Sequence, residues 1–419
     1  MTQAMDFRDA LQGINVVDFS WIGAGPLTAQ WLANFGATVV KVEHPQHYDL
    51  LRTSPPFKDG KFGINTSYYF AACNSNKYGI TLDLNKPKGR ALAHKLVRWA
   101  DVLVENFMPG TMKRWGLDYE SARALNQRLI MISLSIQGQT GPHANSAGFG
   151  PMLMGLAGIG HLGGWPDRAP GCATVPYPDW VSPLFASFAI VSALDYRERT
   201  GEGQYIDLSQ YEATAQFLGP AILDYTVNGR VWERAGNLLI DSDRPYAAPH
   251  GAYPTKGADR WCAVAVFNDD EWRRLVDLMG NPDWAADSRF ESHDARCLHT
   301  EELDQRFGQW TAGFDAPRLM RMLQDRGIAA GVVHDQQGVY EDPQLNARRH
   351  FQYLEHPEMG RYHVELPAPH LSATPATMRK ASPTIGGDND HVYKTVLGLS
   401  QEEYDQLIAE EVIGYWEGD

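Results

Sequence analysis

A regular alternation of short apolar runs with amphipathic segments over the first 210 residues constrains the fold of this chain most strongly. Six runs have the length and β-branched content of strands: 14–19, 38–42, 80–84, 102–105, 129–134 and 204–208. Three segments between them have helical periodicity: 26–35, 86–99 and 117–126. Strands that alternate with helices in this way form a parallel sheet with helices on both faces. We therefore predict the α/β class.

The texture changes after this region. A glycine-rich stretch at 155–164 precedes an apolar segment at 181–194 and a predicted helix at 211–227. A smaller α+β domain is then predicted from these segments: strands 261–267 and 328–333, and helices 269–279, 300–314 and 316–326. A last helix is expected at 400–412, where Ser400 and Glu403 fit a capping box. The predicted division is a large domain at 1–230, a small domain at 231–335, and a segment at 336–419 that returns to the large domain.

Composition limits the partners. The formal net charge of −14 argues against a general nucleic-acid binder, which needs a basic face. Residues 1–12 are polar and lack the apolar core of a signal peptide, and no apolar run has the length of a membrane span. The four cysteines form no C-x-x-C pair: Cys73, Cys172, Cys262 and Cys297. We expect a cytoplasmic protein in a reducing compartment, with no disulfide framework, no metal site and no membrane partner.

One motif near the N-terminus suggests nicotinamide binding. Gly23-Ala24-Gly25 follows the first predicted strand, and Glu43 lies where a ribose-binding acid would stand. However, Thr28 replaces the third glycine, and Pro26 removes an N–H that a pyrophosphate would need. We therefore predict a tight strand-to-helix turn here and no permanently bound cofactor.

Six segments, in order along the chain, carry a family resemblance: 13–26, 32–43, 74–84, 100–110, 126–130 and 179–207. They include Leu-Ala-Asn-Phe-Gly-Ala-Thr-Val-Val-Lys-Val-Glu, Ala-Asp-Val-Leu-Val-Glu-Asn-Phe-Met-Pro-Gly and Thr-Gly-Glu-Gly-Gln. Together they resemble the class III CoA-transferases of the formyl-CoA transferase type. The resemblance implies a Rossmann-like large domain, a smaller domain, an interlocked dimer, and a coenzyme A thioester as substrate.

The resemblance identifies Asp179 as the catalytic nucleophile. A carboxylate can hold an activated acyl group as an anhydride or as a thioester, so it suits CoA exchange between acids. From local sequence alone, a helix N-cap explains Asp179 better than a nucleophile does, and the helix dipole at that position favours its ionised form. The glycines of the 155–164 stretch are candidate backbone donors for the oxyanions: Gly155, Gly158, Gly160, Gly163 and Gly164.

The resemblance also predicts the coenzyme-binding residues: Ile22, His44, Asn76, Lys77, Asn106, Phe107 and Arg114. Phe107 is expected to pack against coenzyme A, and Asn106 to hydrogen bond to it. Lys77 and Arg114 match basic positions that meet phosphates in the family, although without the family a solvated surface charge is the favoured explanation of both. His44 stands where some relatives carry arginine, and an imidazole is a weaker cation at neutral pH.

Aromatic residues near Asp179 indicate the acyl group. Trp165, Tyr177 and Trp180 would suit a bulky acid, if they line a pocket and are not simply core. We expect succinyl-CoA as donor and an aromatic or branched dicarboxylic acceptor of the benzylsuccinate type. One alternative is a 2-methylacyl-CoA racemase of the same fold, whose second base is a histidine. The corresponding stretch here reads Gly148-Phe149-Gly150-Pro151 without a histidine; His143 lies nearby in a different motif, and His161 is a residual candidate. Another alternative is one subunit of a heteromeric transferase.

Overall fold

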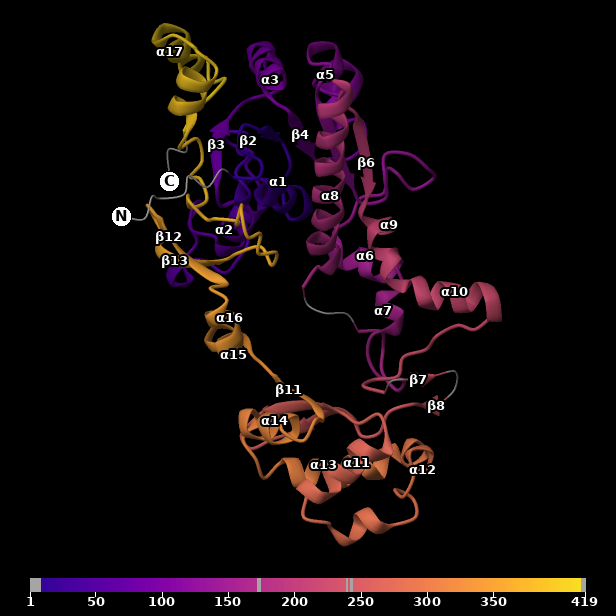
Figure 1. Cartoon of the computed structure of the whole chain (residues 1–419). Coiled ribbons are helices and arrows are strands. Elements are labelled where there is room, and N and C mark those ends of the chain that lie inside the picture. The colour runs from indigo at the N-terminus through magenta and orange to yellow at the C-terminus, as the bar shows by residue number, and fades with distance from the viewer. Residues whose placement is uncertain (1–8, 172–174, 239, 242–243, 416–419) are drawn as a thin grey trace. The chain divides into compact units, whose positions relative to one another are not determined.

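The computed structural model describes residues 9–171, 175–238, 240–241 and 244–415. The chain forms two compact units, coloured along the sequence in Figure 1. The first unit comprises Met1–Ile159, Cys172–Arg230 and Asn346–Asp419, and the second comprises Gly160–Gly171 and Val231–Leu345. The chain thus leaves the first unit and returns to it.

A six-stranded parallel sheet forms the centre of the first unit, as the strand–helix alternation predicted. Its strands are β1 (Asn15–Asp18), β2 (Thr38–Glu43), β3 (Lys77–Thr81), β4 (Val102–Glu105), β5 (Ile130–Ser135) and β6 (Tyr205–Ser209). Their order is β3-β2-β1-β4-β5-β6. The order reverses between β1 and β4, and the crevice outside the carboxyl ends of strands at such a point is where α/β proteins bind ligands.

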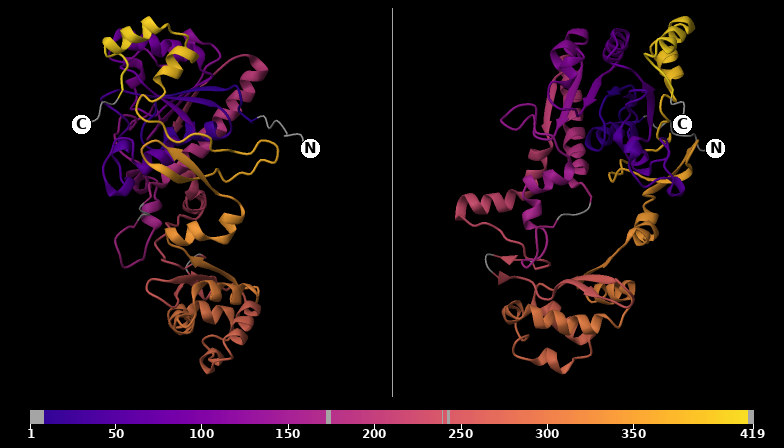
Figure 2. Two further views of the ribbon diagram at one scale, coloured as in Figure 1. Left: turned by 90° about the vertical axis from the view of Figure 1, so that its left-hand side faces the viewer. Right: turned by 180° about the vertical axis from the view of Figure 1, so that it is seen from behind.

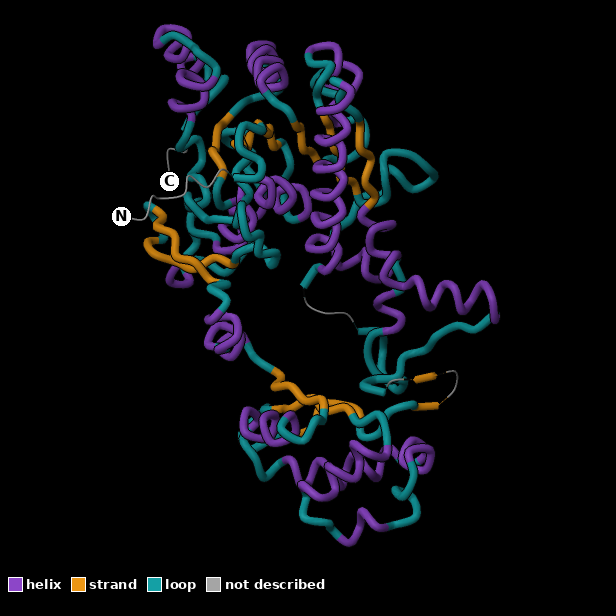
Figure 3. The backbone as a smooth tube through the Cα atoms, viewed as in Figure 1, coloured by secondary structure: helices purple, strands orange, loops and turns teal. Residues whose placement is uncertain are grey.

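Helices cover both faces of this sheet (Figures 1 and 3). On one face, α1 (Ala24–Asn34) and α8 (Tyr177–Thr200) share a core with β1, β4 and β5. On the other, α3 (Pro87–Trp99) and α5 (Tyr119–Leu125) share a core with the strands. The unit's other helices are α2 (Tyr68–Asn74), α4 (Thr111–Arg114), α6 (Gly150–Leu156), α9 (Gln210–Ala215), α10 (Gly219–Asn228) and α17 (Gln401–Ala409).

The second unit is a small α+β body. Its antiparallel sheet has the order β11-β10-β9, from β9 (His250–Pro254), β10 (Trp261–Ala265) and β11 (Ala329–Val333). Its helices include α11 (Asp269–Leu278), α12 (His293–Leu298), α13 (Thr300–Thr311), α14 (Ala316–Gln324) and α15 (Gln336–Glu341). The short strands β7 (Ile240–Asp241) and β8 (Arg244–Pro245) pair with each other. Two short helices, α7 (Ile159–Leu162) and α16 (Pro343–Ala347), lie where the chain changes units.

The C-terminal segment packs against β3, and Figure 2 shows it beside the N-terminal strands in both views. The Asp388 carboxylate accepts a hydrogen bond from the Gly79 N–H at 2.8 Å, and the Tyr393 hydroxyl donates to the Thr81 carbonyl at 2.7 Å. This segment also contains the hairpin of β12 (Phe351–His356) and β13 (Gly360–Glu365). The predicted capping box of Ser400 and Glu403 is confirmed at the start of α17.

Three of the four cysteines are buried free thiols: Cys73, Cys262 and Cys297. Cys172 lies outside the described residues. Over the described ranges, no helix combines the length and the apolar character that a membrane span requires.

Candidate active site

Asp179 lies in the first turn of α8, near the start of a 24-residue helix. It is not the N-cap, because Pro176 holds that position and accepts a hydrogen bond from the Asp179 N–H at 2.9 Å. The N-cap interpretation is therefore wrong. The helix begins earlier than the apolar run suggested because Pro178 starts a helix well: its fixed φ is helical and its missing N–H would have no partner there.

Two glycines from distant parts of the chain lie directly against this carboxylate. A Cβ placed on Gly23 would lie 2.8 Å from the Asp179 Cβ, and a Cβ on Gly150 would lie 2.9 Å from its Oδ2. Gly23 is the N-cap of α1, and Gly150 is the first residue of α6. Since real Cβ atoms do not approach so closely, both positions require glycine if Asp179 is to keep its place.

The surroundings of Asp179 favour its protonated form. Burial raises the pKa of the carboxyl group from 3.8 to about 6. The sequence led us to expect the opposite direction, because the helix dipole lowers the pKa of a first-turn acid. Desolvation outweighs the dipole here, although the group still ionises near neutral pH.

An apolar cluster borders Asp179 on one side. Its buried members are Leu27, Leu51, Phe70 and Cys73, and Ile22, Tyr69 and Trp180 pack against it. Burial, with smaller contributions from Cys73 and Asp179, raises the pKa of the Tyr69 hydroxyl to about 12, so this phenol remains a neutral donor. Sequence reasoning missed Tyr69, because it stands in a run of apolar and aromatic residues that is typical of core.

Residues 19–23 link β1 to α1, and Gly23 at the end of this link lies against Asp179. The Asn106 amide pairs with both backbone groups of Trp21: its Oδ1 accepts from the Trp21 N–H at 2.8 Å, and its Nδ2 donates to the Trp21 carbonyl at 2.6 Å. Asn106 was predicted to hydrogen bond to coenzyme A. Here the amide holds the loop, and its hydrogen bond to coenzyme A stays a prediction, because the oxygen has a second lone pair and the nitrogen a second N–H.

A pocket of about 220 Å³ opens beside this loop, at the carboxyl ends of β1, β2, β3 and β4. Three aromatic rings form one wall: the Phe107 ring lies edge-on to Trp21 at 5.8 Å and to Trp115 at 5.5 Å between centroids. The lining residues are Phe19, Trp21, Val42, Glu43, His44, His47, Leu82, Leu84, Asn85, Phe107 and Trp115. The structure thus brings the predicted residues Phe107 and His44 to one pocket.

His44 lies at the rim of this pocket with its imidazole already partnered. Its Nδ1 accepts hydrogen bonds from the backbone N–H groups of Gln46 and His47, and its Nε2 lies 3.4 Å from the Asp83 carboxylate. Burial lowers the pKa of His44, although Asp83 opposes the shift. His44 therefore brings little positive charge at neutral pH.

The structure corrects two further predictions. The Lys77 ammonium is fully buried and donates to Asp18, Pro26 and Asn74, each at 2.8 Å, so it has no donor left for a phosphate. The Asn76 amide joins Asn34 to the backbone of 377–380. Both side chains hold the fold together and do not face the pocket. Arg114, by contrast, is exposed at the end of α4.

The glycine-rich stretch does not supply the glycines next to Asp179. Gly155 lies within α6 with open space around it, and Gly158 follows the end of α6 with a φ of +84°. Gly160, Gly163 and Gly164 belong to the second unit. The oxyanion role predicted for this stretch therefore has no support in the first unit, where Gly23 and Gly150 take the place beside the carboxylate.

The predicted aromatic residues lie in both units. Tyr177 and Trp180 are in the first turn of α8, and the Tyr177 ring lies edge-on to Phe217 at 5.9 Å. Trp165 lies in the second unit, where a Cβ on Gly236 would lie 2.8 Å from its indole nitrogen. His161, the residual racemase candidate, is also in the second unit, next to the Trp232 carbonyl and Glu233. Within the described ranges, no three His, Cys, Asp or Glu side chains cluster as a metal site requires.

Comparison with known proteins decides the family. Residues 11–389 match CoA-transferase family III. The chain belongs to this family. It is 35% identical over 404 residues to the succinyl-CoA–D-citramalate CoA-transferase of Chloroflexus aurantiacus, covering 96% of this chain and 98% of that protein. It is 31% identical to the beta subunit of the succinyl-CoA–L-malate CoA-transferase of the same organism, covering 96% and 98%.

A solved structure agrees with this assignment. A CaiB/BaiF family protein from Brucella suis superimposes with a TM-score of 0.84 at 32% identity, covering 92% of this chain and 99% of that one. The CoA-transferase predicted from the sequence is therefore confirmed at the level of family, fold and enzyme class. The chain is an enzyme that transfers coenzyme A.

Proposed function

We propose that this CoA-transferase moves coenzyme A from succinyl-CoA to a dicarboxylic acid through covalent intermediates on Asp179. The observation that carries the proposal is the position of this carboxylate. It lies partly buried between Gly23 and Gly150, next to the crevice where the strand order reverses. With a pKa of about 6, it is ionised at neutral pH yet poorly solvated, which favours nucleophilic attack.

The reaction consists of balanced acyl transfers. A carboxylate oxygen of Asp179 attacks the thioester carbonyl carbon of succinyl-CoA, the C–S bond breaks, and a mixed anhydride and CoA thiolate result. The thiolate then attacks the aspartyl carbonyl carbon, and cleavage of the C–O bond releases succinate and leaves an aspartyl-CoA thioester. The acceptor carboxylate attacks the carbonyl carbon of this thioester, and cleavage of the C–S bond releases the thiolate and leaves a new mixed anhydride. The thiolate finally attacks the acceptor's carbonyl carbon, and cleavage of the C–O bond releases the acceptor's CoA thioester and the Asp179 carboxylate.

The start of α1 supplies donors for the negative charge that develops in each step. The backbone N–H groups in the first turn of a helix have no partner within the helix. Gly23 caps α1 against Asp179, so the N–H groups of Ala24 and Gly25 belong to the turn nearest the reacting carbonyl. Fixed amide dipoles of this kind stabilise an oxyanion more than water does, because they are already oriented.

The aromatic pocket is the proposed site for part of coenzyme A. Phe107, Trp21 and Trp115 offer flat apolar surfaces, and the pocket is adjacent to residues 20–23, which reach Asp179. The exposed Arg114 follows Phe107 along the chain and can pair with a phosphate. His44 would act as a neutral hydrogen-bonding group at the rim.

For the acceptor, we propose a dicarboxylic acid that carries a substituent on its carbon chain. The two named relatives act on D-citramalate and L-malate, which are both substituted dicarboxylic acids. Tyr177 and Trp180 occupy the same helical turn as Asp179, and they are the residues of the first unit proposed to meet the substituent. Aromatic walls of this kind suit a branched or aryl-bearing chain.

We also propose that the chain works as a dimer, with a second copy or with a related subunit. On α8, Leu184, Phe188 and Val191 form one exposed apolar stripe, and Phe188 is 76% exposed. No residue of the ten-residue α10 is buried, although four of its apolar residues are exposed. An isolated helix of this length is marginal in water, so it needs another surface to pack against.

Quenching the enzyme during turnover with succinyl-CoA and identifying the modified residue by mass spectrometry tests the chemistry. We expect an adduct on Asp179, and Asp179→Asn should lose at least about 10³-fold in CoA exchange, since the nucleophile is removed. Asp304→Asn is the matched control, because burial also raises the pKa of the Asp304 carboxyl to about 6, but in the second unit. Normal exchange in Asp179→Asn, or an adduct elsewhere, would overturn the mechanism.

A panel of acceptors tests the substrate proposal separately. Purified enzyme with succinyl-CoA should form the CoA thioesters of citramalate, malate or benzylsuccinate faster than those of formate, oxalate or carnitine. Preference for the second group, none of which is a dicarboxylic acid with a substituted carbon chain, would end the proposed acceptor class and leave the role of Asp179 intact.

A further inference from the structure

Each residue of the loop at 20–23 is fixed by a group from another part of the first unit. The Lys41 ammonium donates to the Ser20 carbonyl at 2.8 Å, and the Asn106 amide holds Trp21 as described above. The Ile22 N–H donates to the Asp49 Oδ1 at 3.0 Å. Gly23 then meets Asp179. Each residue of the loop, from the end of the sheet to the candidate nucleophile, therefore has a contact that fixes its position.

Ile22 has a backbone conformation that its side chain disfavours. Its φ is +67°, in the left-handed region, where a β-branched residue is a genuine outlier. Such a conformation is strained and persists only where the surroundings impose it. Residues in such conformations cluster at active sites, and this one directly precedes the glycine that contacts Asp179.

The Asp49 carboxylate imposes this left-handed conformation on Ile22. Its Oδ1 accepts from the N–H groups of Ile22 and Leu51, both at 3.0 Å, and its Oδ2 accepts from the Lys41 ammonium at 2.9 Å. Both Asp49 and Lys41 are completely buried. Both oxygens are thus used, and the carboxylate joins β2, which contains Lys41, to the loop.

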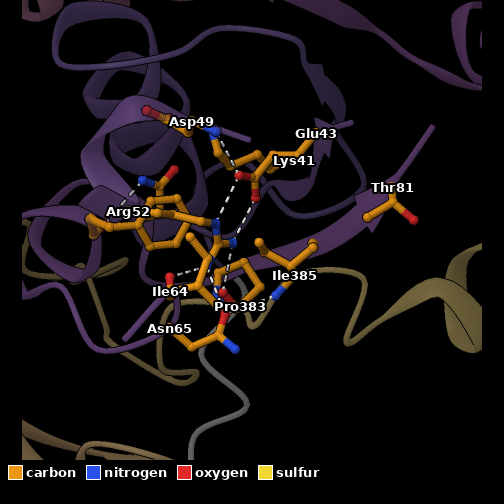
Figure 4. Close-up of polar contacts among 12 residues, drawn as sticks. Lys41, Glu43, Asp49, Arg52, Ile64, Asn65, Thr81, Pro383 and Ile385 are labelled. Carbon is orange, nitrogen blue, oxygen red and sulfur yellow. Dashed lines mark hydrogen bonds and ion pairs between the residues drawn. The ribbon is translucent and has the colours of Figure 1, made fainter. Parts of the chain in front are cut away.

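A second buried ion pair fixes Asp49 in turn (Figure 4). The Glu43 carboxylate accepts from the Asp49 N–H at 3.0 Å and from the Arg52 guanidinium, whose Nη2 lies 2.6 Å from Oε2. Arg52 also donates to the Pro383 carbonyl at 3.1 Å, so the C-terminal segment braces the same network. The carboxylate that meets Ile22 therefore has little freedom to move.

We propose that Asp49 is a positioning residue for the acyl transfer: its carboxylate holds Ile22 in the left-handed conformation that seats Gly23 against Asp179. The proposal rests on the proposed function of Asp179 and adds a residue to it. Asp49 touches neither substrate nor Asp179. It acts by fixing where α1 begins, and with it the amides of the first turn that face the reacting carbonyl.

If Asp49 served stability alone, the exact position of its acceptor oxygen would matter less. A buried ion pair often contributes no more to stability than well-packed apolar residues of the same volume. The bond to the Ile22 N–H, however, needs an acceptor at one defined point. Loss of this acceptor should therefore change the chemical step more than the binding of coenzyme A, because Asn106 holds the pocket residue Trp21 independently.

Asp49→Ala tests this inference with Asp101→Ala as the matched control. Asp101 also pairs with a buried arginine, Arg197, at 2.9 Å, but it precedes β4 at the amino ends of the strands, away from the candidate site. Asp49→Ala removes both oxygens, so the Ile22 N–H loses its acceptor, whereas an asparagine would keep an oxygen that accepts from it. We expect kcat to fall about 10- to 100-fold, as small displacements of catalytic groups do, while KM for acyl-CoA stays within about threefold.

The outcomes separate the two proposals. If the wild type forms no adduct on Asp179, the proposed function fails. If the wild type is active and Asp49→Ala keeps its kcat, or if Asp101→Ala loses as much, or if only KM rises, the positioning role is overturned. Hydrogen exchange of the wild-type enzyme covers the case of a variant that does not fold. The Ile22 amide should exchange slowly for a loop residue, and fast exchange there would also overturn the role.

Discussion

At the scale of single residues, the burial of Asp179 favours activity but lowers the stability of the folded enzyme at neutral pH. Its burial makes the carboxylate a poorly solvated nucleophile and at the same time raises its pKa to about 6. Only the ionised form can attack a thioester. The rate of adduct formation in a single turnover should therefore be constant above pH 7 and fall about tenfold for each pH unit below 6. A rate that stays level from pH 7 to pH 5 would contradict this assignment.

The same pKa predicts the pH dependence of stability. Because the folded state binds this proton more tightly than the unfolded chain does, the ionised Asp179 costs on the order of 2 kcal/mol at pH 7. Asp179→Asn should therefore raise the free energy of unfolding at pH 7. The gain should shrink as pH falls from 6 to 4 and vanish below about 3, where both states are protonated. Urea unfolding at several pH values measures this, and a destabilised variant at pH 7 would count against it.

The two glycines of α6 form a matched pair for a residue-scale experiment. A Cβ at position 150 would lie 2.7 Å from the Pro176 Cβ and 2.9 Å from the Asp179 Oδ2, whereas a Cβ at 155 would meet nothing within 4 Å. Gly150→Ala should reduce CoA exchange at least tenfold by displacing the carboxylate. Gly155→Ala should keep the activity and stabilise the helix by up to about 1 kcal/mol. Equal activities in the two variants would exclude a steric role for Gly150.

At the scale of elements, most boundaries followed from hydrophobic periodicity, but β3 did not. The strand was expected at 80–84 and lies at Lys77–Thr81. It begins with a lysine that is completely buried, because Asp18 and two carbonyl-type oxygens accept its hydrogen bonds. A charged residue at the start of an apolar run indicates the end of a loop unless its buried partner is known. Here that partner, Asp18, lies on β1.

The predicted helix at 211–227 divides for a related reason. Gly219 and Pro220 start a new helix, α10, after α9 and a short 3₁₀ turn. In the site, the sequence identified Asp179 and Phe107 by resemblance. It did not identify Gly23 and Gly150 as the residues beside the carboxylate, because only the fold brings these three helix starts together. Tertiary neighbours of this kind leave no local pattern.

Lys77 and Arg114 allow a test that separates a structural cation from a ligand-binding one. Lys77→Met leaves Asp18 buried without its partner and should destabilise the first unit by about 3–5 kcal/mol. Arg114→Ala, on the exposed end of α4, should leave stability within about 0.5 kcal/mol of the wild type and raise KM for acyl-CoA. Thermal unfolding and steady-state kinetics of both variants distinguish the roles. A stable Lys77→Met enzyme with a raised KM would restore the phosphate-binding prediction.

At the scale of the whole molecule, the exposed apolar surface of the first unit still needs an explanation, because it has no role in the catalytic steps. The stripe of Leu184, Phe188 and Val191 spans two turns of α8, the helix that also carries Asp179. Large exposed apolar patches mark interaction sites. If two chains pack through this surface, assembly and the position of the nucleophile depend on the same helix, and dissociation should reduce activity as well as size.

Phe188→Glu tests this dependence, since it places a charge in the middle of the stripe. We expect sedimentation equilibrium to give a dimer for the wild type and a shift towards monomer for the variant, with CoA exchange falling in proportion to the dimer lost. Leu298→Glu is the control: Leu298 is 70% exposed, but it lies in the second unit. A monomeric wild type would remove the basis for a dimer of identical chains and leave a related subunit as the partner, because α10 still needs a surface to cover it. A monomeric and fully active Phe188→Glu enzyme would show that the surface serves neither assembly nor catalysis.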